Sequence, residues 1–131
     1  MAFYLETSAL VKLVLPEAES SALRAWVTGA DSDLVASDLV RTELLRAVRS
    51  TDESSSGAAK VVLDGLVLFP FSPRILDAAG LLAPPELRSL GAIHLAAALA
   101  LGDDLDGLVT YDLRLRQAAE AYGLTVLSPG A

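Results

Sequence analysis

The chain has 131 residues, a net charge of −7 and a hydrophobic content of 53%, so a disordered tail or solvated linker is excluded. It contains no cysteine and one histidine, which excludes disulfides, zinc–thiolate sites and multi-histidine metal sites. The acidic balance also excludes a protein that holds nucleic acid by bulk charge alone. The first residues have no basic region and reach Glu6 early, so we do not expect them to act as a signal peptide. The longest apolar stretch, 95–101, is far shorter than the ~20 residues of a membrane span. We therefore expect a cytoplasmic protein whose residues 1–131 form a single domain.

Short apolar runs alternate with helical segments along the whole chain. The runs that predict strands lie at residues 2–5, 34–36, 67–71, 107–110 and 124–127. The segments that predict helices lie at residues 6–15, 16–29, 38–49, 58–66, from 72 onward, 90–101 and 113–122. The polar stretch 52–57 indicates a loop between two helices.

Local signals mark several of these boundaries. Thr7 or Ser8 is available to cap the first helix, and Ser89 is available to cap the helix at 90–101. Ser72 followed by Pro73 is a strong helix start. Pro70 places the strand at 67–71 near an edge or an end of a sheet.

Strands that are short, apolar and separated by helices favour an α/β fold: three layers, α/β/α, around a mostly parallel central sheet. In such sheets the ligand site lies beyond the carboxyl ends of the strands. Glu6 follows the first strand and Asp112 follows the fourth, so both acids are expected at that edge.

Each candidate acid also has a structural interpretation. Asp112 is well placed to cap the last helix. Glu43 lies between Arg41 and Arg46 and is open to a solvent-exposed ion pair, yet it borders the apolar stripe of its helix. If Glu6, Glu43 and Asp112 converge, their mutual repulsion requires cations between them. Such hard oxygen ligands select Mg²⁺ or Mn²⁺, and two such ions can hydrolyse a phosphodiester.

Four short motifs occur in order and cover nearly the whole chain. They are Phe-Tyr-Leu-Glu-Thr-Ser-Ala-Leu from residue 3, Thr-Glu-Leu from residue 42, Leu-Arg-Ser-Leu-Gly-Ala-Ile-His-Leu-Ala from residue 87, and Val-Thr-Tyr-Asp from residue 109. Together they resemble the acidic motifs of PIN-domain ribonucleases, and at this chain length the VapC-type toxins of bacterial toxin–antitoxin pairs.

The resemblance implies a Mg²⁺- or Mn²⁺-dependent endoribonuclease with a PIN-like fold, in which Glu6, Glu43 and Asp112 are the catalytic, metal-holding acids. It also implies a tRNA or ribosomal RNA substrate, a VapB-type antitoxin as partner, and a homodimer. Thr7 and Ser8 match residues beside the first acid, where a hydroxyl positions a ligand or water, although helix capping explains them equally well.

Two positions depart from the motifs. The first acid is normally Asp and is Glu6 here, and the third motif normally carries Asp where this chain has Gly91. The four expected carboxylates are thus reduced to three, which predicts weaker metal binding and impaired cleavage. Natural divergence and selection for an inactivated toxin both explain the change, since each substitution needs one base change.

His94 follows Gly91 by three positions and so shares its helix face, where either a packed histidine or a site residue is expected. Arg41, Arg46 and Arg49 on one helix, with Arg114 and Arg116 on another, are candidates for phosphate contacts.

Two other classes of similar length do not fit the pattern of acids. A response-regulator receiver needs a phosphoacceptor Asp after the third strand, and an aspartyl phosphatase needs Asp-x-Asp after the first, so both are excluded. A PIN-like module that binds antitoxin or RNA without cutting remains the alternative.

Overall fold

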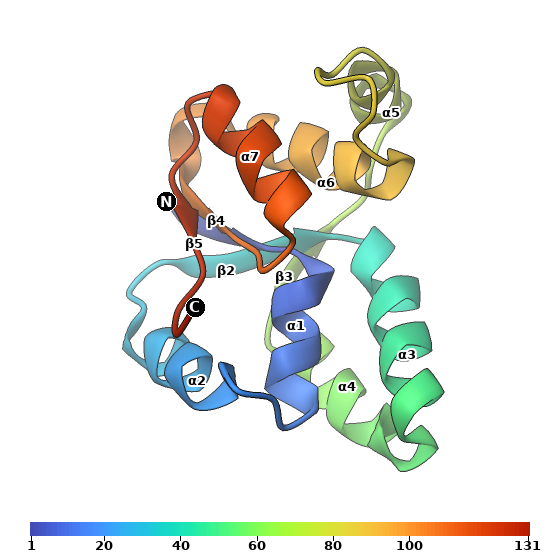
Figure 1. Cartoon of the computed structure of the whole chain (residues 1–131), viewed down its shortest axis with the longest axis vertical. Coiled ribbons are helices and arrows are strands. Elements are labelled where there is room, and N and C mark those ends of the chain that lie inside the picture. Colours follow the sequence, from blue (N-terminus) through green and yellow to red (C-terminus); the bar gives the residue numbers. More distant parts are fainter.

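The computed structural model describes residues 1–131 as five parallel strands between two layers of helices (Figure 1). The strands are β1 Ala2–Leu5, β2 Asp33–Ser37, β3 Val67–Phe69, β4 Leu105–Val109 and β5 Val126–Leu127. The helices are α1 Thr7–Val14, α2 Ser20–Gly29, α3 Leu39–Thr51, α4 Ser56–Asp64, α5 Pro73–Gly80, α6 Ser89–Leu99 and α7 Leu113–Ala121. The predicted three-layer α/β/α fold is confirmed, and the sheet is wholly parallel.

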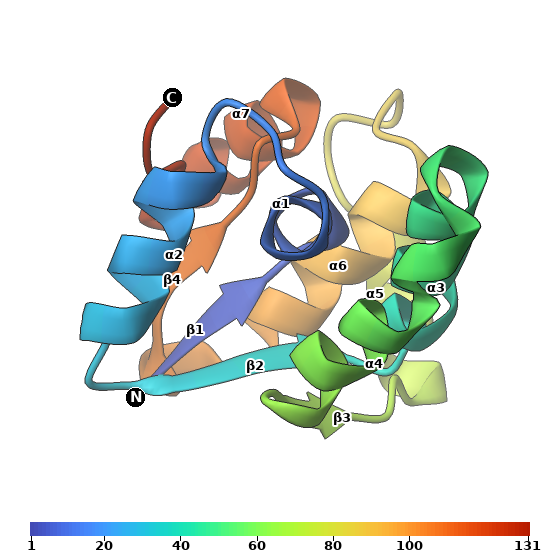
Figure 2. The ribbon, with the colours of Figure 1, turned by 90° about the horizontal axis from the view of Figure 1, so that it is seen from below.

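The strand order is β3-β2-β1-β4-β5, so the chain starts at the centre of the sheet and reverses direction there. Helices α1 to α4 cover one face, and α5 to α7 cover the other (Figures 1 and 2). The reversal lies between β1 and β4, which are neighbours in the sheet. In such sheets a ligand site is expected at the carboxyl ends of this pair of strands.

The strand β1 contributes to both cores because successive side chains point to opposite faces. Leu5 is buried with Leu10, Val40 and Leu44 on the α1–α4 side. Tyr4 is buried with Leu95 and other residues on the α5–α7 side. A central strand with both faces covered accounts for the unbroken apolar run in the sequence.

Several predicted boundaries need correction. The helix expected from residue 16 begins only at Ser20, whose hydroxyl bonds the Leu15 carbonyl and accepts the Glu17 N–H. The loop expected at 52–57 contains a 3₁₀ turn, Glu53–Ser55, and already includes the start of α4. Ser89 is the first residue of α6 and not its cap, because Arg88 occupies that position.

Other boundary signals are confirmed. Ser72 accepts the Ile75 N–H and caps α5, and β3 lies at the edge of the sheet, as Pro70 indicated. Gly123 follows α7 with φ +82°, a conformation that side-chain-bearing residues rarely adopt. None of the helices has both the length and the apolar character needed to span a bilayer.

Candidate active site

A polar pocket of about 410 Å³ lies at the carboxyl ends of β1 and β4. The two strands pair with Leu5 opposite Val109, and the Glu6 N–H donates to the Val109 carbonyl at 3.0 Å. The residues that follow both strands therefore lie together. The lining residues are Glu6, Glu43, Leu87, Arg88, Leu90, Gly91, His94, Asp112 and Arg114. All three predicted acids thus face one pocket, which we call the carboxylate pocket.

Glu6 is held by two hydroxyl groups. Its Oε1 accepts hydrogen bonds from Ser8 and Thr110, both at 2.6 Å, and only 8% of the residue is exposed. Thr110 is itself fully buried and also accepts the Asp112 N–H at 3.1 Å. Glu6 Oε2 has no partner in the protein and is not a buried atom, so it is open to the pocket.

Asp112 caps α7, as its structural interpretation predicted. Its Oδ1 accepts the main-chain N–H groups of Arg114 and Leu115 at 2.9 and 3.2 Å. The other oxygen, Oδ2, accepts no hydrogen bond from the protein. Capping and ligand binding therefore use different oxygens, and one role does not exclude the other.

Glu43 makes no ion pair with Arg41 or Arg46. Its Oε1 instead lies 2.5 Å from Nε2 of His94 and accepts the Thr7 hydroxyl at 2.6 Å. Burial raises the pKa of the Glu43 carboxyl, but the hydrogen bond and charge interaction with His94 and the hydrogen bond from Thr7 outweigh it. The pKa of Glu43 therefore lies below the ordinary glutamate value, which favours the carboxylate form.

Thr7 and Ser8 do not cap α1, because no side chain makes that hydrogen bond. The Thr7 hydroxyl bonds Glu43, and the Ser8 hydroxyl bonds Glu6 while accepting the Tyr111 N–H at 2.9 Å. Of the two interpretations of these hydroxyls, contact with the acids agrees with the structure.

Sequence reasoning missed three residues that hold the acids. Thr110 donates to Glu6, and Tyr4 and Ser37 form a hydrogen-bonded group with His94. All three lie within or next to buried strands, which the apolar pattern predicts to be purely hydrophobic core. A hydroxyl-bearing residue in or beside a buried strand is the one signal that could have identified them, because such a group must find a partner.

Gly91 is the third residue of α6 and lines the carboxylate pocket. A Cβ built there would meet Leu87 Cδ1 at 3.5 Å, which is ordinary van der Waals contact. The position therefore accepts a side chain pointing from the start of α6. An acid there would also interact favourably with the helix N-terminus.

The donor chemistry fits a hard, hydrated cation. Glu6, Glu43 and Asp112 each bind the protein through one oxygen and keep the other without a protein partner. No group of three or more His, Cys, Asp and Glu side chains is arranged to hold a metal ion. One or two carboxylates plus several waters is the usual protein environment of Mg²⁺, so the pocket fits that ion better than one needing a closed cage.

Two arginines without ion-pair partners border the carboxylate pocket, Arg88 before α6 and Arg114 in α7. Other arginines are engaged elsewhere: Arg41 with Asp38, Arg49 with Glu53, and Arg116 with Glu120. The Arg49–Glu53 contact joins two exposed residues four positions apart in the sequence. The acids at 103, 104 and 106 do not line the pocket, and Asp106 accepts the Ser32 hydroxyl instead.

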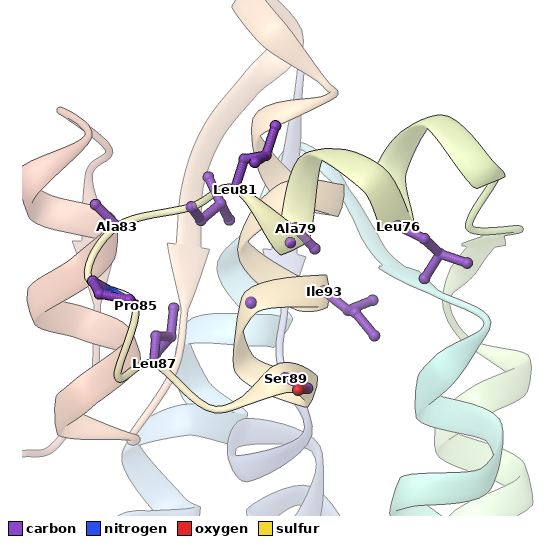
Figure 3. Close-up of a pocket in the computed structure, with 11 residues that line it drawn as sticks. Leu76, Ala79, Leu81, Ala83, Pro85, Leu87, Ser89 and Ile93 are labelled. Carbon is purple, nitrogen blue, oxygen red and sulfur yellow. The ribbon is translucent and has the colours of Figure 1, made fainter.

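A larger cavity of about 550 Å³ lies between α5, α6 and the connection that joins them. Figure 3 shows Leu81, Ala83 and Pro85 along this connection and Ile93 on α6. No ionisable side chain lines it, so it offers no groups for hydrolytic chemistry. Its size does not make it the candidate active site.

The family follows from comparison with known proteins. The PIN domain family model matches residues 3–121, most of the chain and all four motifs. The chain belongs to the PIN domain family. Within it, the resemblance to VapC ribonucleases is confirmed: Ribonuclease VapC46 of Mycobacterium tuberculosis is 46% identical over 128 residues, covering 98% of each chain. Ribonuclease VapC47 of the same species is 41% identical, covering 98% of this chain and 97% of the relative.

Solved structures agree on the PIN fold. Mycobacterium tuberculosis VapC20, described as a sarcin–ricin loop cleaving toxin, superposes with a TM-score of 0.79 at 13% identity, covering 97% of this chain and 99% of that one. VapBC2 from Rickettsia felis, solved with a promoter DNA fragment, gives a TM-score of 0.71 at 18% identity, with coverage of 97% and 98%. At these identities the likeness concerns the PIN fold alone.

Proposed function

We propose that this PIN-domain chain is the toxin of a VapBC-type pair and hydrolyses RNA phosphodiesters at the carboxylate pocket with Mg²⁺ or Mn²⁺. One observation carries the proposal: Glu6, Glu43 and Asp112 each keep an oxygen free in one pocket at the carboxyl ends of β1 and β4. The full-length similarity to ribonucleases supports the same reaction.

Glu6, Glu43 and Asp112 are the residues whose free oxygens would hold the ion, one or two of them directly and the rest through bound water. When bound, such an ion activates water and neutralises charge on the cleaved phosphodiester. The chain's own contribution is to fix the acids: Ser8 and Thr110 orient Glu6, Thr7 and His94 orient Glu43, and the first N–H groups of α7 orient Asp112.

Arg88 and Arg114 are proposed to bind the RNA backbone beside the acids. Arginine recognises phosphate oxygens through its planar array of donors, and these two spend no donors on ion pairs. A hollow of about 500 Å³ shares Leu87 and Arg114 with the carboxylate pocket and continues along α7 past Gln117. This continuity suits a strand of RNA that extends beyond the cleaved bond. The positive charges of Arg88 and Arg114 offset the overall acidity of the chain at this place.

The site is proposed to be impaired relative to a four-acid site. Gly91 supplies no ligand from α6, and Glu6 extends its carboxylate one methylene further than Asp would. Fewer charged ligands lower the affinity for a divalent ion, so cleavage should require higher metal concentrations.

The second candidate is a PIN module that binds antitoxin or RNA without cutting. Its support is that no three acidic or histidine side chains are arranged around a common ion. The two candidates share the PIN fold and differ only in metal-dependent cleavage.

A VapB-type antitoxin is the proposed partner and a homodimer the proposed assembly. Two structures that share this fold, VapBC2 from Rickettsia felis and FitAB, were solved with DNA fragments, and the names of both denote a pair of components. FitAB superposes with a TM-score of 0.70 at 15% identity. Because VapC20 is described as cleaving the sarcin–ricin loop, a tRNA or ribosomal RNA substrate is proposed for this chain.

The test is cleavage of total bacterial RNA in Mg²⁺ or Mn²⁺, with Gly91→Asp and Asp112→Asn versions run beside the chain. The proposal expects weak metal-dependent cleavage that Gly91→Asp increases and Asp112→Asn abolishes. Absence of cleavage by both the chain and the Gly91→Asp version would favour the non-cutting module.

A further inference from the structure

A chain of buried polar side chains extends from the sheet to the edge of the carboxylate pocket. Tyr4, Ser37 and His94 come from β1, the end of β2 and the middle of α6, and each is at most 1% exposed. Buried polar groups are costly unless they bond one another. The Tyr4 oxygen lies 2.7 Å from His94 Nδ1 and 3.1 Å from the Ser37 hydroxyl, and it also accepts the Ser37 N–H at 3.2 Å.

These contacts fix which nitrogen of His94 faces Glu43. The Tyr4 hydroxyl donates to Ser37 Oγ, and its oxygen lies 2.7 Å from His94 Nδ1, which ties that nitrogen to the buried end of the group. The other nitrogen, Nε2, is 2.5 Å from Glu43 Oε1. A carboxylate oxygen only accepts hydrogen bonds, so Nε2 carries the hydrogen of this contact.

We propose that His94 is a positioning residue, which Tyr4 and Ser37 lock with Nε2–H directed at Glu43 so that the other Glu43 oxygen faces the carboxylate pocket. Thr7 donates to the same Oε1 and completes the restraint. The inference rests on the proposed function, in which that second oxygen holds the ion. It also defines what α6 contributes to the site: a donor from His94, in a helix that has Gly91 where an acid is expected.

Packing alone does not account for this arrangement. A histidine that only fills the core has no reason to present one nitrogen to the pocket that contains the acids, whereas His94 lines that pocket. Glu43 has no other hydrogen-bond or ion-pair partner besides Thr7 and His94. Partners that orient a metal-binding side chain through a hydrogen bond typically change metal affinity or activity by about 10–100-fold when removed.

The first test uses the fact that His94 is the only histidine of the chain. A long-range ¹H–¹⁵N spectrum of the metal-free protein therefore contains one imidazole. The proposal expects a proton on Nε2 in the parent, and loss of this single arrangement in Tyr4→Phe. The matched control is Tyr111→Phe, which removes a phenol bonded to the Pro129 carbonyl outside the pocket and should leave the imidazole unchanged. Proton on Nδ1 with Nε2 bare would overturn the proposal.

The second test measures Mn²⁺ affinity by calorimetry in the Gly91→Asp background. His94→Leu should weaken binding about tenfold, whereas His94→Gln, whose amide nitrogen replaces Nε2 as a donor, should recover most of it. Equal affinity of the parent and the Leu version would overturn the positioning role. Glu43→Gln distinguishes failure of the proposed metal site from failure of the positioning role. If Glu43→Gln leaves Mn²⁺ affinity unchanged, the assignment of Glu43 as a ligand fails. If Glu43→Gln weakens Mn²⁺ binding and His94→Leu does not, only the positioning role of His94 fails.

Discussion

Glu43 and Glu6 face the same pocket, but different kinds of contact hold them. Glu43 is restrained by residues far apart in sequence, Thr7 on α1 and His94 on α6. Glu6 and Asp112 are restrained by groups at the ends of adjacent strands: the hydroxyls of Ser8 and Thr110, and main-chain N–H groups of α7. The strand-end side of the pocket is therefore built by the sheet itself. The Glu43 side depends on side-chain contacts that join Glu43 on α3 to Thr7 on α1 and to His94 on α6, in the opposite helical layer.

The two sides of the pocket also differ at position 91, where the proposed function expects a further acid. Gly91 belongs to α6, the helix that also restrains Glu43, so the ligand that the proposal expects would fall on the Glu43 side. Glu6, Glu43 and Asp112 each keep their own hydrogen-bond partners. The proposed site therefore holds its three acids in place and has one charge fewer than the expected four.

The largest effect is expected from Asp112→Asn, which tests the strand-end side. Asparagine caps helices as well as aspartate, so the thermal midpoint should stay unchanged while Mn²⁺ affinity falls about 100-fold. Calorimetric titration and thermal unfolding measure the two quantities. Asp112→Ala is the control, because it should also lose about 1 kcal/mol of stability with the cap. Unchanged Mn²⁺ affinity in the Asn version would show that Asp112 only caps α7.

Arg114→Gln should weaken RNA binding uniformly and reduce the salt dependence of the binding constant by about one unit of log–log slope. Arg114 lies on the strand-end side and Arg88 lies before α6. Arg114→Gln and Arg88→Gln therefore compare the contributions of the two sides to RNA binding. Arg49→Gln, on an exposed arginine paired with Glu53, is the control. Affinity measured at several salt concentrations decides the point, and equal slopes for all versions would contradict the proposed RNA path.

Thr110→Val should destabilise the protein by about 1–2 kcal/mol, because the buried Glu6 carboxylate loses a donor and the Asp112 N–H loses its acceptor. Urea unfolding measures this cost. Ser8→Ala is the comparison, since it also leaves Glu6 with one hydroxyl donor. A Thr110→Val protein as stable as the parent would mean that the strand-end restraints are dispensable.

The smallest effect concerns alkaline stability. Burial raises the pKa of Tyr4, so its contribution to stability is fully present below the unfolded value of about 10 and declines as the pH rises further. Tyr4→Phe should therefore lose less stability than the parent between about pH 8 and about pH 11, as measured by urea unfolding. Tyr111, whose pKa is raised by more modest burial, provides the control, and its Phe version should behave more like the parent. An equal loss of stability with rising pH in the parent, Tyr4→Phe and Tyr111→Phe would contradict the buried state of Tyr4.

Sequence reasoning succeeded where a local pattern carries the information. The apolar runs identified all five strands, and the rule for parallel sheets selected Glu6 and Asp112 because each directly follows a predicted strand. Prediction failed at boundaries decided by competing contacts. Ser20 bonds Leu15 and Glu17 and delays α2, and Arg88 takes the cap position predicted for Ser89.

The partners of Glu43 could not be predicted, because they come from residues 36 and 51 positions away. In the sequence Glu43 has charged neighbours in Arg41 and Arg46, and only the packing of α6 against the sheet brings His94 to it. The hydroxyls of Thr7 and Ser8 had two interpretations for the same reason: local sequence favours a cap, and tertiary contact with the acids prevails.

The most direct measurement is calorimetric titration of Mn²⁺ into the chain, the Gly91→Asp version and a Gly91→Asn version of the same size without the charge. The central claim is that the carboxylate pocket is a divalent-metal site short of one ligand from α6. It predicts that Gly91→Asp binds Mn²⁺ about 10–100-fold more tightly than the chain and that Gly91→Asn does not. Equal Mn²⁺ binding by all three proteins would contradict it.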